Sequence, residues 1–106
     1  GDLSGAVLDG FVITGATNTT GNGGGIANLM SSSASPSSAP QFRNLLIVSN
    51  TSSVAFGSGA GIYNLNSGTG AFAAVFQNCS VQNNTAPNGT GGGLFVQNTT
   101  SGTSSI

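Results

Sequence analysis

The strongest constraint on the fold is a ten-residue block that occurs three times at a constant spacing. It reads LDGFVITGAT from Leu8, FRNLLIVSNT from Phe42 and FQNCSVQNNT from Phe76, so each copy begins 34 residues after the previous one. Aligned without gaps, three positions of the block are apolar in every copy. These inward columns are Leu8/Phe42/Phe76, Phe11/Leu45/Cys79 and Ile13/Ile47/Val81. An internal repeat of this length indicates a stack of similar units with a shared core.

A fourth column of the block, Gly10/Asn44/Asn78, predicts a bend at the same place in every copy. Glycine and asparagine adopt the left-handed backbone conformation at the lowest cost. Asparagines stacked at bends are expected to hydrogen-bond along the stack, where the backbone cannot pair regularly. Two further bend columns are predicted, Gly15/Ser49/Asn83 and Asn28/Asn64.

Glycine-rich segments recur between the copies of the block and predict a further strand. GGGIAN from Gly23, GAGIYN from Gly59 and GGGLFV from Gly91 align on another apolar column, Ile26/Ile62/Leu94. Strands and turns account for the glycine, asparagine, serine and threonine content better than helices do. We therefore predict an all-β fold, a parallel β-solenoid whose coils of ~34 residues span about 7–41, 42–75 and 76–106.

Two of these motifs resemble a known group of proteins. FQNCSVQNN and GGGIAN are similar to the repeats of right-handed parallel β-helices of the pectate-lyase-like kind. Within that group they resemble the Gly-Gly-x-Ile and Phe-x-Asn repeats of chlamydial polymorphic outer-membrane proteins and similar bacterial surface proteins. The resemblance extends from Leu8 to about Asn98 and implies a right-handed parallel β-helix. It implies no single activity, because this fold carries lyases, adhesins, phage tailspikes and inert stalks.

Charged residues are almost absent, which excludes several classes of partner. The 106 residues include one base (Arg43), two acids (Asp2 and Asp9) and no histidine. Nucleic-acid binding and polybasic membrane contacts both need clustered lysine and arginine. No apolar run approaches the ~20 residues of a transmembrane helix, so we expect no direct membrane insertion.

The ends of the predicted solenoid are expected to be open. The next copy of the ten-residue block is due at about position 110, beyond the last residue, Ile106. A three-coil solenoid with two open ends would expose its core and its unpaired strand edges. We therefore expect a fragment of a longer solenoid or a stacking subunit of a fibre. Its partners would be further coils or identical subunits stacked at both open ends.

Few residues are suited to catalysis or to holding a cofactor. The absence of histidine excludes the usual general base and imidazole–metal sites, and we expect no enzyme activity, metal or cofactor. Asp9 and Arg43 share a column, which predicts an ion pair between neighbouring coils worth about 0–1 kcal/mol. Cys79 has no disulfide partner and is predicted to be a buried apolar residue. Cysteine content therefore leaves the redox compartment undecided.

Six Asn-x-Ser/Thr sequons occur, and four of them are predicted at turns. The four candidate glycosylation sites are Asn18, Asn50, Asn88 and Asn98. Asn78 also lies in a sequon, but as a bend residue it is a poor acceptor.

Three functions remain open at this stage. The first is a non-enzymatic structural or adhesive module, extracellular or on a cell surface, such as a stalk, an adhesin passenger or a filament-forming unit. Its loops at Leu29–Pro40 and Leu65–Ala74 would recognise partners such as surface glycans or host-cell molecules. The second is part of a carbohydrate-binding or carbohydrate-cleaving protein whose site lies outside these residues, and solvent exposure of the Tyr63/Phe95 column would support it. The third is ice binding, although the threonines form no regular Thr-x-Thr column.

Overall fold

The chain folds entirely into short β-strands and connecting turns. The computed structural model describes residues 5–30, 39–99, 101 and 103–105, and these residues contain thirteen strands and no helix. None of these segments is therefore a helix able to span a membrane. Every strand pairing among them is parallel. The all-β character and the parallel arrangement agree with the prediction from the sequence.

The repeated ten-residue block forms two three-stranded parallel sheets. One sheet contains β1 (Val7–Asp9), β5 (Gln41–Arg43) and β10 (Val75–Gln77). The other contains β2 (Val12–Thr14), β6 (Leu46–Val48) and β11 (Ser80–Gln82). Pairing places Leu8, Phe42 and Phe76 in one row and Ile13, Ile47 and Val81 in another. The 34-residue period of the sequence is therefore the distance along the chain between residues that stack.

The glycine-rich segments lead into a third sheet, which contains β4 (Ile26–Met30), β8 (Ile62–Asn66) and β12 (Leu94–Asn98). Two smaller sheets pair β3 (Thr17–Asn18) with β7 (Thr51–Ser52) and β9 (Ala71–Ala73) with β13 (Thr103–Ser105). The three passes of the chain are called repeat 1 (7–40), repeat 2 (41–74) and repeat 3 (75–106). In each large sheet the strand of repeat 2 lies between the other two.

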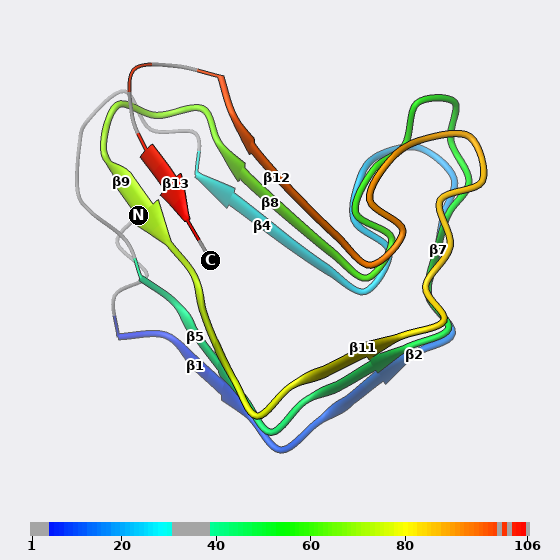
Figure 1. Ribbon diagram of the computed structural model, residues 1–106, viewed down its shortest axis with the longest axis horizontal. Helices are drawn as coiled ribbons and strands as arrows, with labels where there is room; N and C mark the ends of the chain where they lie inside the picture. Colours follow the sequence, from blue (N-terminus) through cyan, green and yellow to red (C-terminus); the bar gives the residue numbers. More distant parts are fainter. Residues whose placement is uncertain (1–4, 31–38, 100, 102, 106) are drawn as a thin grey trace.

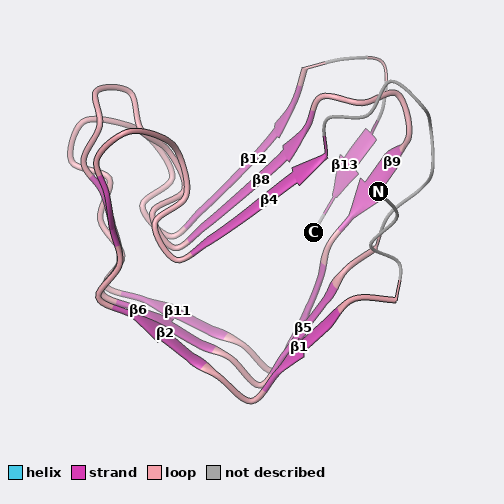
Figure 2. Cartoon of the chain, turned by 180° about the vertical axis from the view of Figure 1, so that it is seen from behind, coloured by secondary structure: helices cyan, strands magenta, loops and turns pink. Residues whose placement is uncertain are grey.

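In the three large sheets the strands of the three repeats lie one above another along the shortest axis of the molecule (Figure 1). The opposite view shows the same superposition from behind (Figure 2). The molecule measures 34 × 31 × 16 Å. Strands paired in one sheet lie about 4.8 Å apart, so the short dimension is the direction of stacking.

The core is centred on repeat 2, because only this repeat has a neighbour on both sides. Leu45, Ile47 and Ile62 are at most 2% exposed, and the Phe42 and Phe76 rings stack at 4.6 Å between centroids. Outer members of the predicted columns are more exposed: Phe11 by 55%, Leu94 by 41% and Val81 by 39%. Their assignment as buried core is therefore wrong for the described chain. They lie in repeat 1 or repeat 3, where only one side of each side chain is covered.

The bend columns have the left-handed backbone conformation in all three repeats. The φ angles are 78° at Gly10 and 52° at both Asn44 and Asn78. In the second column φ is positive as well, at Gly15, Ser49 and Asn83. The Asn78 amide donates to the Asn44 side-chain oxygen at 2.7 Å, so these asparagines also link neighbouring repeats.

The two predicted loops differ from the structure. Strand β8 continues to Asn66 and β9 spans Ala71–Ala73, so half of the predicted loop Leu65–Ala74 is paired strand. The physical reason is burial: Phe72 is fully buried and Ala74 is 2% exposed, which holds this segment against the core. The other predicted loop, Leu29–Pro40, begins inside β4, and its residues 31–38 lie outside the described part of the chain.

Candidate functional site

The ion pair predicted between Asp9 and Arg43 does not form. The two residues are paired in neighbouring strands, but their side chains take other partners. The Asn44 amide donates to the Asp9 carboxylate at 2.8 Å, and the Arg43 guanidinium donates to the Gln41 side-chain oxygen. The register was right, but each charged group has a nearer neutral partner, so no charge pair forms at this surface.

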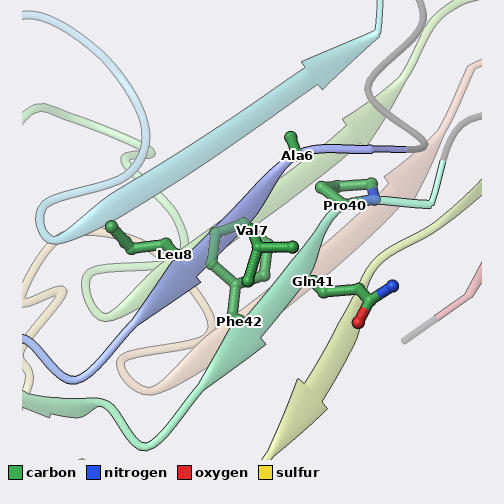
Figure 3. A pocket seen from close by; sticks show the side chains of 6 residues that line it. All are labelled: Ala6, Val7, Leu8, Pro40, Gln41 and Phe42. Atoms are coloured by element: carbon green, nitrogen blue, oxygen red, sulfur yellow. The ribbon is translucent and has the colours of Figure 1, made fainter.

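A small apolar hollow lies where β1 and β5 begin (Figure 3). Its volume is about 120 Å³, and it is lined by Ala6, Val7, Leu8, Pro40, Gln41 and Phe42. Figure 3 shows the polar end of Gln41 pointing away from Leu8. Pockets for drug-sized ligands usually have volumes of about 300–1,000 Å³ and some converging polar groups. This hollow is therefore a packing defect at the outer repeat and does not have the character of a ligand site.

The aromatic pair that could have formed a sugar platform is mostly covered, because Tyr63 is buried and Phe95 is half-buried. The rings of Tyr63 and Phe95 stack at 5.8 Å between centroids with an interplanar angle of 10°. Tyr63 is only 4% exposed, and its hydroxyl donates to the Gln97 side-chain oxygen at 2.9 Å. Carbohydrate binding needs an exposed aromatic face, so this pair does not support that function.

Asn50 is the clearest correction among the predicted glycosylation sites. It is fully buried, and its amide nitrogen donates to the Ile13 carbonyl at 3.0 Å and to the Asn84 side-chain oxygen at 3.0 Å. A glycan would replace a hydrogen on this same nitrogen, so it would remove at least one of these bonds and open the core. The turn at this position was predicted correctly, but the Asn50 side chain points inward.

The other three predicted acceptors lie nearer the surface. Asn18 is half-buried, and its amide nitrogen donates to the carbonyls of Asn22 and Gly23 at 3.1 Å each. Asn88 is exposed and donates to the Ser53 carbonyl at 3.1 Å. Asn98 is exposed at the end of β12. Asn88 and Asn98 are therefore the more exposed of these three residues.

The arrangement that the sequence reasoning missed is a corner built by asparagine side chains. The Asn50 side-chain oxygen accepts from the Ala16 backbone N–H at 3.1 Å, while its amide donates to the Ile13 carbonyl. Asn84 repeats this one level further along: its oxygen accepts from the Asn50 N–H at 2.9 Å and its amide donates to the Ile47 carbonyl at 2.9 Å. The 34-residue spacing of Ala16, Asn50 and Asn84, each followed by threonine, was the available signal.

We call Ala16, Asn50 and Asn84 the corner position. At this position each asparagine satisfies one backbone donor and one backbone acceptor of the preceding repeat. These groups lie where the chain leaves one sheet for the next and cannot all pair with a neighbouring strand. The asparagine side chain thus joins neighbouring repeats at this turn.

A column of glycines allows the backbones of neighbouring repeats to approach closely. A Cβ atom added at Gly25 would lie 2.8 Å from the Gly61 carbonyl oxygen, and one added at Gly61 would overlap the Gly93 carbonyl oxygen. Gly93, the third member, differs: the nearest atom is Val81 Cγ1 at 3.7 Å, an ordinary contact. Glycine is therefore sterically required at the first two positions and not at the third.

Asn28 and Asn64 do not form the predicted hydrogen-bonded bend. They lie inside strands β4 and β8 and point toward the core, at 7% and 0% exposure. Both side-chain polar atoms of Asn64, and the amide nitrogen of Asn28, have no hydrogen-bond partner among the described residues. Val96 occupies the matching position in β12, so an apolar side chain is compatible with this row.

Asn64→Val is expected to raise the free energy of unfolding by about 1 kcal/mol, because it removes a buried amide that makes no hydrogen bond. Asn66→Val in the same strand is the matched control. The Asn66 amide donates to the carbonyls of Gly70 and Thr103 at 2.9 and 2.8 Å, and its oxygen accepts from the Gly68 N–H at 2.9 Å. Asn66→Val removes these three hydrogen bonds and should lower the free energy of unfolding by about 2–3 kcal/mol. Urea denaturation of both variants measures the difference, and a destabilising Asn64→Val would contradict the assignment.

Phe56 combines full exposure with a strained backbone. Its side chain is 89% exposed and its φ is 63°, a conformation that bulky residues rarely adopt. Its backbone N–H donates to the Asn88 carbonyl at 2.9 Å, which holds the turn against repeat 3. An exposed aromatic side chain contributes little to folding, so the strain here is not offset by burial.

Phe56→Asn is expected to raise the free energy of unfolding by about 1 kcal/mol, since asparagine tolerates this conformation better than phenylalanine. Asn44, Asn78 and Asn83 already adopt it in this chain. Ala55→Asn, at an exposed neighbour without positive φ, is the control and should change stability by less than ~0.5 kcal/mol. Thermal melting of both variants is the measurement. Equal effects at the two positions would mean that the turn is not strained.

Threonines at the residue after the corner form one regular column. Thr17 pairs with Thr51, and Thr51 with Thr85, so the three stack at the spacing of neighbouring strands. Thr17 and Thr85 are exposed, and Thr51 is half-buried. A Thr-x-Thr column was sought in the sequence and this column of single threonines was missed, although the 34-residue period contains it.

The remaining chemically reactive group is Cys79. Its thiol is half-buried against the core and lies 3.4 Å from the carbonyls of Phe42 and Gln77. Within the described ranges no three His, Cys, Asp or Glu residues lie close enough to hold a metal ion. Cys79 is less buried than predicted because it belongs to repeat 3, where one side of the column is uncovered.

Comparison with known protein families, with curated proteins and with solved structures finds no match to this chain. The functions open to this chain therefore follow from its geometry. The geometry consists of stacked side chains that join repeats, together with two exposed outer edges.

Proposed function

We propose that the chain is a segment of a β-solenoid, a right-handed parallel β-helix, that serves as a non-enzymatic structural or adhesive module. The observation that carries the proposal is the common register of the sheets. Rows of equivalent residues run through all three repeats in each large sheet, and the corner asparagines join the same repeats. Such backbone pairing in one direction makes a stiff element that can be extended by adding repeats.

The scarcity of ionisable groups supports a structural role over a catalytic one. The chain has no histidine or lysine, and Asp9 and Arg43 are engaged with neutral side chains. General acid–base chemistry needs a titratable group with a free position toward a substrate. Within this chain, polar side chains instead join neighbouring repeats, as at Asn50 and Asn84.

The adhesive part of the proposal rests on the turn at Phe56. An aromatic side chain that is 89% exposed on a strained turn is a candidate contact residue for a partner. The chain has only three charged residues, which suits contact with neutral glycans or with other cell-surface molecules. An extracellular or surface location and stacking partners at both outer edges, either further repeats or identical subunits, belong to the same proposal.

Two measurements on the native material test this function. Protease treatment of intact cells should remove the protein, and negative-stain electron microscopy should show rods or fibres with a cross-section near the 34 × 31 Å of one repeat layer. The intact mass then distinguishes a long chain of repeats from a subunit of 10.2 kDa. Protection from protease until the cells are lysed, together with compact particles, would contradict the proposal.

Ice binding is a second candidate because of the column formed by Thr17, Thr51 and Thr85. Solenoids that bind ice do so with flat ranks of threonine, and this column supplies one such rank. A thermal-hysteresis assay tests it, with Thr51→Val as the variant and wild-type protein as the reference. Absence of hysteresis in the wild-type protein would remove this candidate.

A further inference from the structure

The side chains of the corner asparagines bond backbone groups in only one direction along the stack. Asn50, in repeat 2, bonds the backbone of repeat 1, and Asn84, in repeat 3, bonds the backbone of repeat 2. Each repeat is therefore completed at its corner by the repeat that follows it. This polarity makes the two outer edges of the stack different from each other.

In repeat 3 the groups that need such a side chain are the Asn84 N–H and the Val81 carbonyl. They are equivalent to the Ala16 N–H and the Ile13 carbonyl, which Asn50 satisfies in repeat 1. Strand β11 is an edge strand, and no asparagine among the described residues lies beyond it. This edge, formed by β10, β11 and β12, is called the C-terminal edge.

The opposite edge cannot supply the missing side chain. The residue at the corner position of repeat 1 is Ala16, which has no side-chain amide. If the repeat-1 edge of a second copy stacked on the C-terminal edge, Ala16 would face the Asn84 N–H and the Val81 carbonyl. Two backbone groups would then be covered without a hydrogen-bond partner, which opposes association.

Gly93 gives independent support for a partner at the C-terminal edge. In the glycine column a Cβ atom points toward the next repeat: at Gly25 it would meet the Gly61 carbonyl, and at Gly61 the Gly93 carbonyl. At Gly93 only Val81 Cγ1 is near, at 3.7 Å. Nothing among the described residues requires glycine there, whereas a following repeat would place its own carbonyl at that point.

We propose that the C-terminal edge is a docking surface for one kind of partner, a further repeat with asparagine at the corner position. The same edge of the stack then rejects the repeat-1 edge of an identical chain. This inference rests on the proposed function and specifies its partner. In this proposal the Asn84 N–H and the Val81 carbonyl bond the side chain of the incoming asparagine. Gly93 leaves room for the backbone carbonyl of the added repeat.

The test extends the full chain by one repeat. Thr103 pairs with Ala71, so a copy of residues 41–74 attached directly after Ile106 keeps the register of the stack. The extension should slow hydrogen exchange at the Asn84 N–H by roughly tenfold or more, since this N–H gains an acceptor. The same extension with Asn50→Ala in the copied repeat should lose that protection. Equal protection with both extensions would overturn the proposal, as would an extension that does not protect Asn84 at all.

Gly93→Ala distinguishes docking from general stability. In the unextended chain it should leave the melting temperature unchanged, and in the extended chain it should remove the protection at Asn84. Unchanged protection would show that the added repeat does not approach as proposed. Sedimentation of the unextended chain completes the test: it should show no end-to-end assembly, and fibres would identify a second copy as a sufficient partner and overturn the proposal.

The docking proposal and the proposed function are tested by different experiments, so one can be contradicted while the other stands. The exchange measurements use only purified chain and say whether the edge accepts an asparagine-bearing repeat. The protease and microscopy experiments concern the native material and its location. Fibres of the unextended chain would contradict the docking proposal while still supporting a structural module.

Discussion

Gly61→Ala is expected to lower the melting temperature of the chain by roughly 10–20 °C, which corresponds to a loss of about 2–4 kcal/mol. A Cβ atom at this position would overlap the Gly93 carbonyl oxygen and lie 2.9 Å from both Asn84 Nδ2 and Val81 Cγ1. The obstacle is backbone of the stacked repeat, so relief requires repeat 3 to move. Thermal melting followed by far-UV circular dichroism measures the change.

Gly93→Ala is the matched control for this substitution. It makes the same chemical change in the same column, but its nearest neighbour would be Val81 Cγ1 at 3.7 Å. We expect a change of less than about 0.5 kcal/mol. Two glycines that look equivalent in the sequence should thus differ by several kcal/mol in their tolerance of alanine. Similar melting temperatures for the two variants would show that the repeats are not packed as closely as described.

Ile47→Asp is expected to abolish folding at neutral pH. Ile47 is fully buried in the central strand β6, between Ile13 and Val81. The change removes a core side chain and introduces a charge without a cation to pair with it, at a cost of about 5 kcal/mol or more. Domains of this size are stable by only about 5–15 kcal/mol. The expected circular dichroism spectrum is that of an unfolded chain.

Val81→Asp tests whether burial is the cause. Val81 occupies the same column in repeat 3 but is 39% exposed, so a carboxylate there can remain hydrated. We expect a loss of about 1–2 kcal/mol and a folded protein. A folded Ile47→Asp variant with near wild-type stability would mean that this column does not face the core.

Much of the fold could be predicted because the repeat period determines which residues pair in neighbouring strands. A spacing of 34 residues placed Ile13, Ile47 and Val81 in one row without knowledge of the structure. Gly10, Asn44 and Asn78 were recognisable as a bend because few residue types adopt positive φ. These inferences use only properties that every repeat shares.

Features that depend on position within the stack could not be predicted in this way. Phe11 and Leu45 belong to one column, yet one is 55% exposed and the other 2%, because only the second lies in the middle repeat. The direction of the Asn50 side chain was missed for a related reason. The amino-acid sequence of a sequon at a turn is the same whether its asparagine side chain points outward or toward the backbone of a neighbouring repeat.

The single direction of the corner bonds has a consequence for the order in which the chain becomes ordered. A protein is synthesised from its N-terminus, so Ala16 and Ile13 leave the ribosome before Asn50, whose side chain bonds them. Repeat 1 can therefore close its corner only after repeat 2 has emerged as far as Asn50, and repeat 2 only after Asn84 has followed. Folding during synthesis would run about one repeat behind translation, and each new repeat would fix the one made before it.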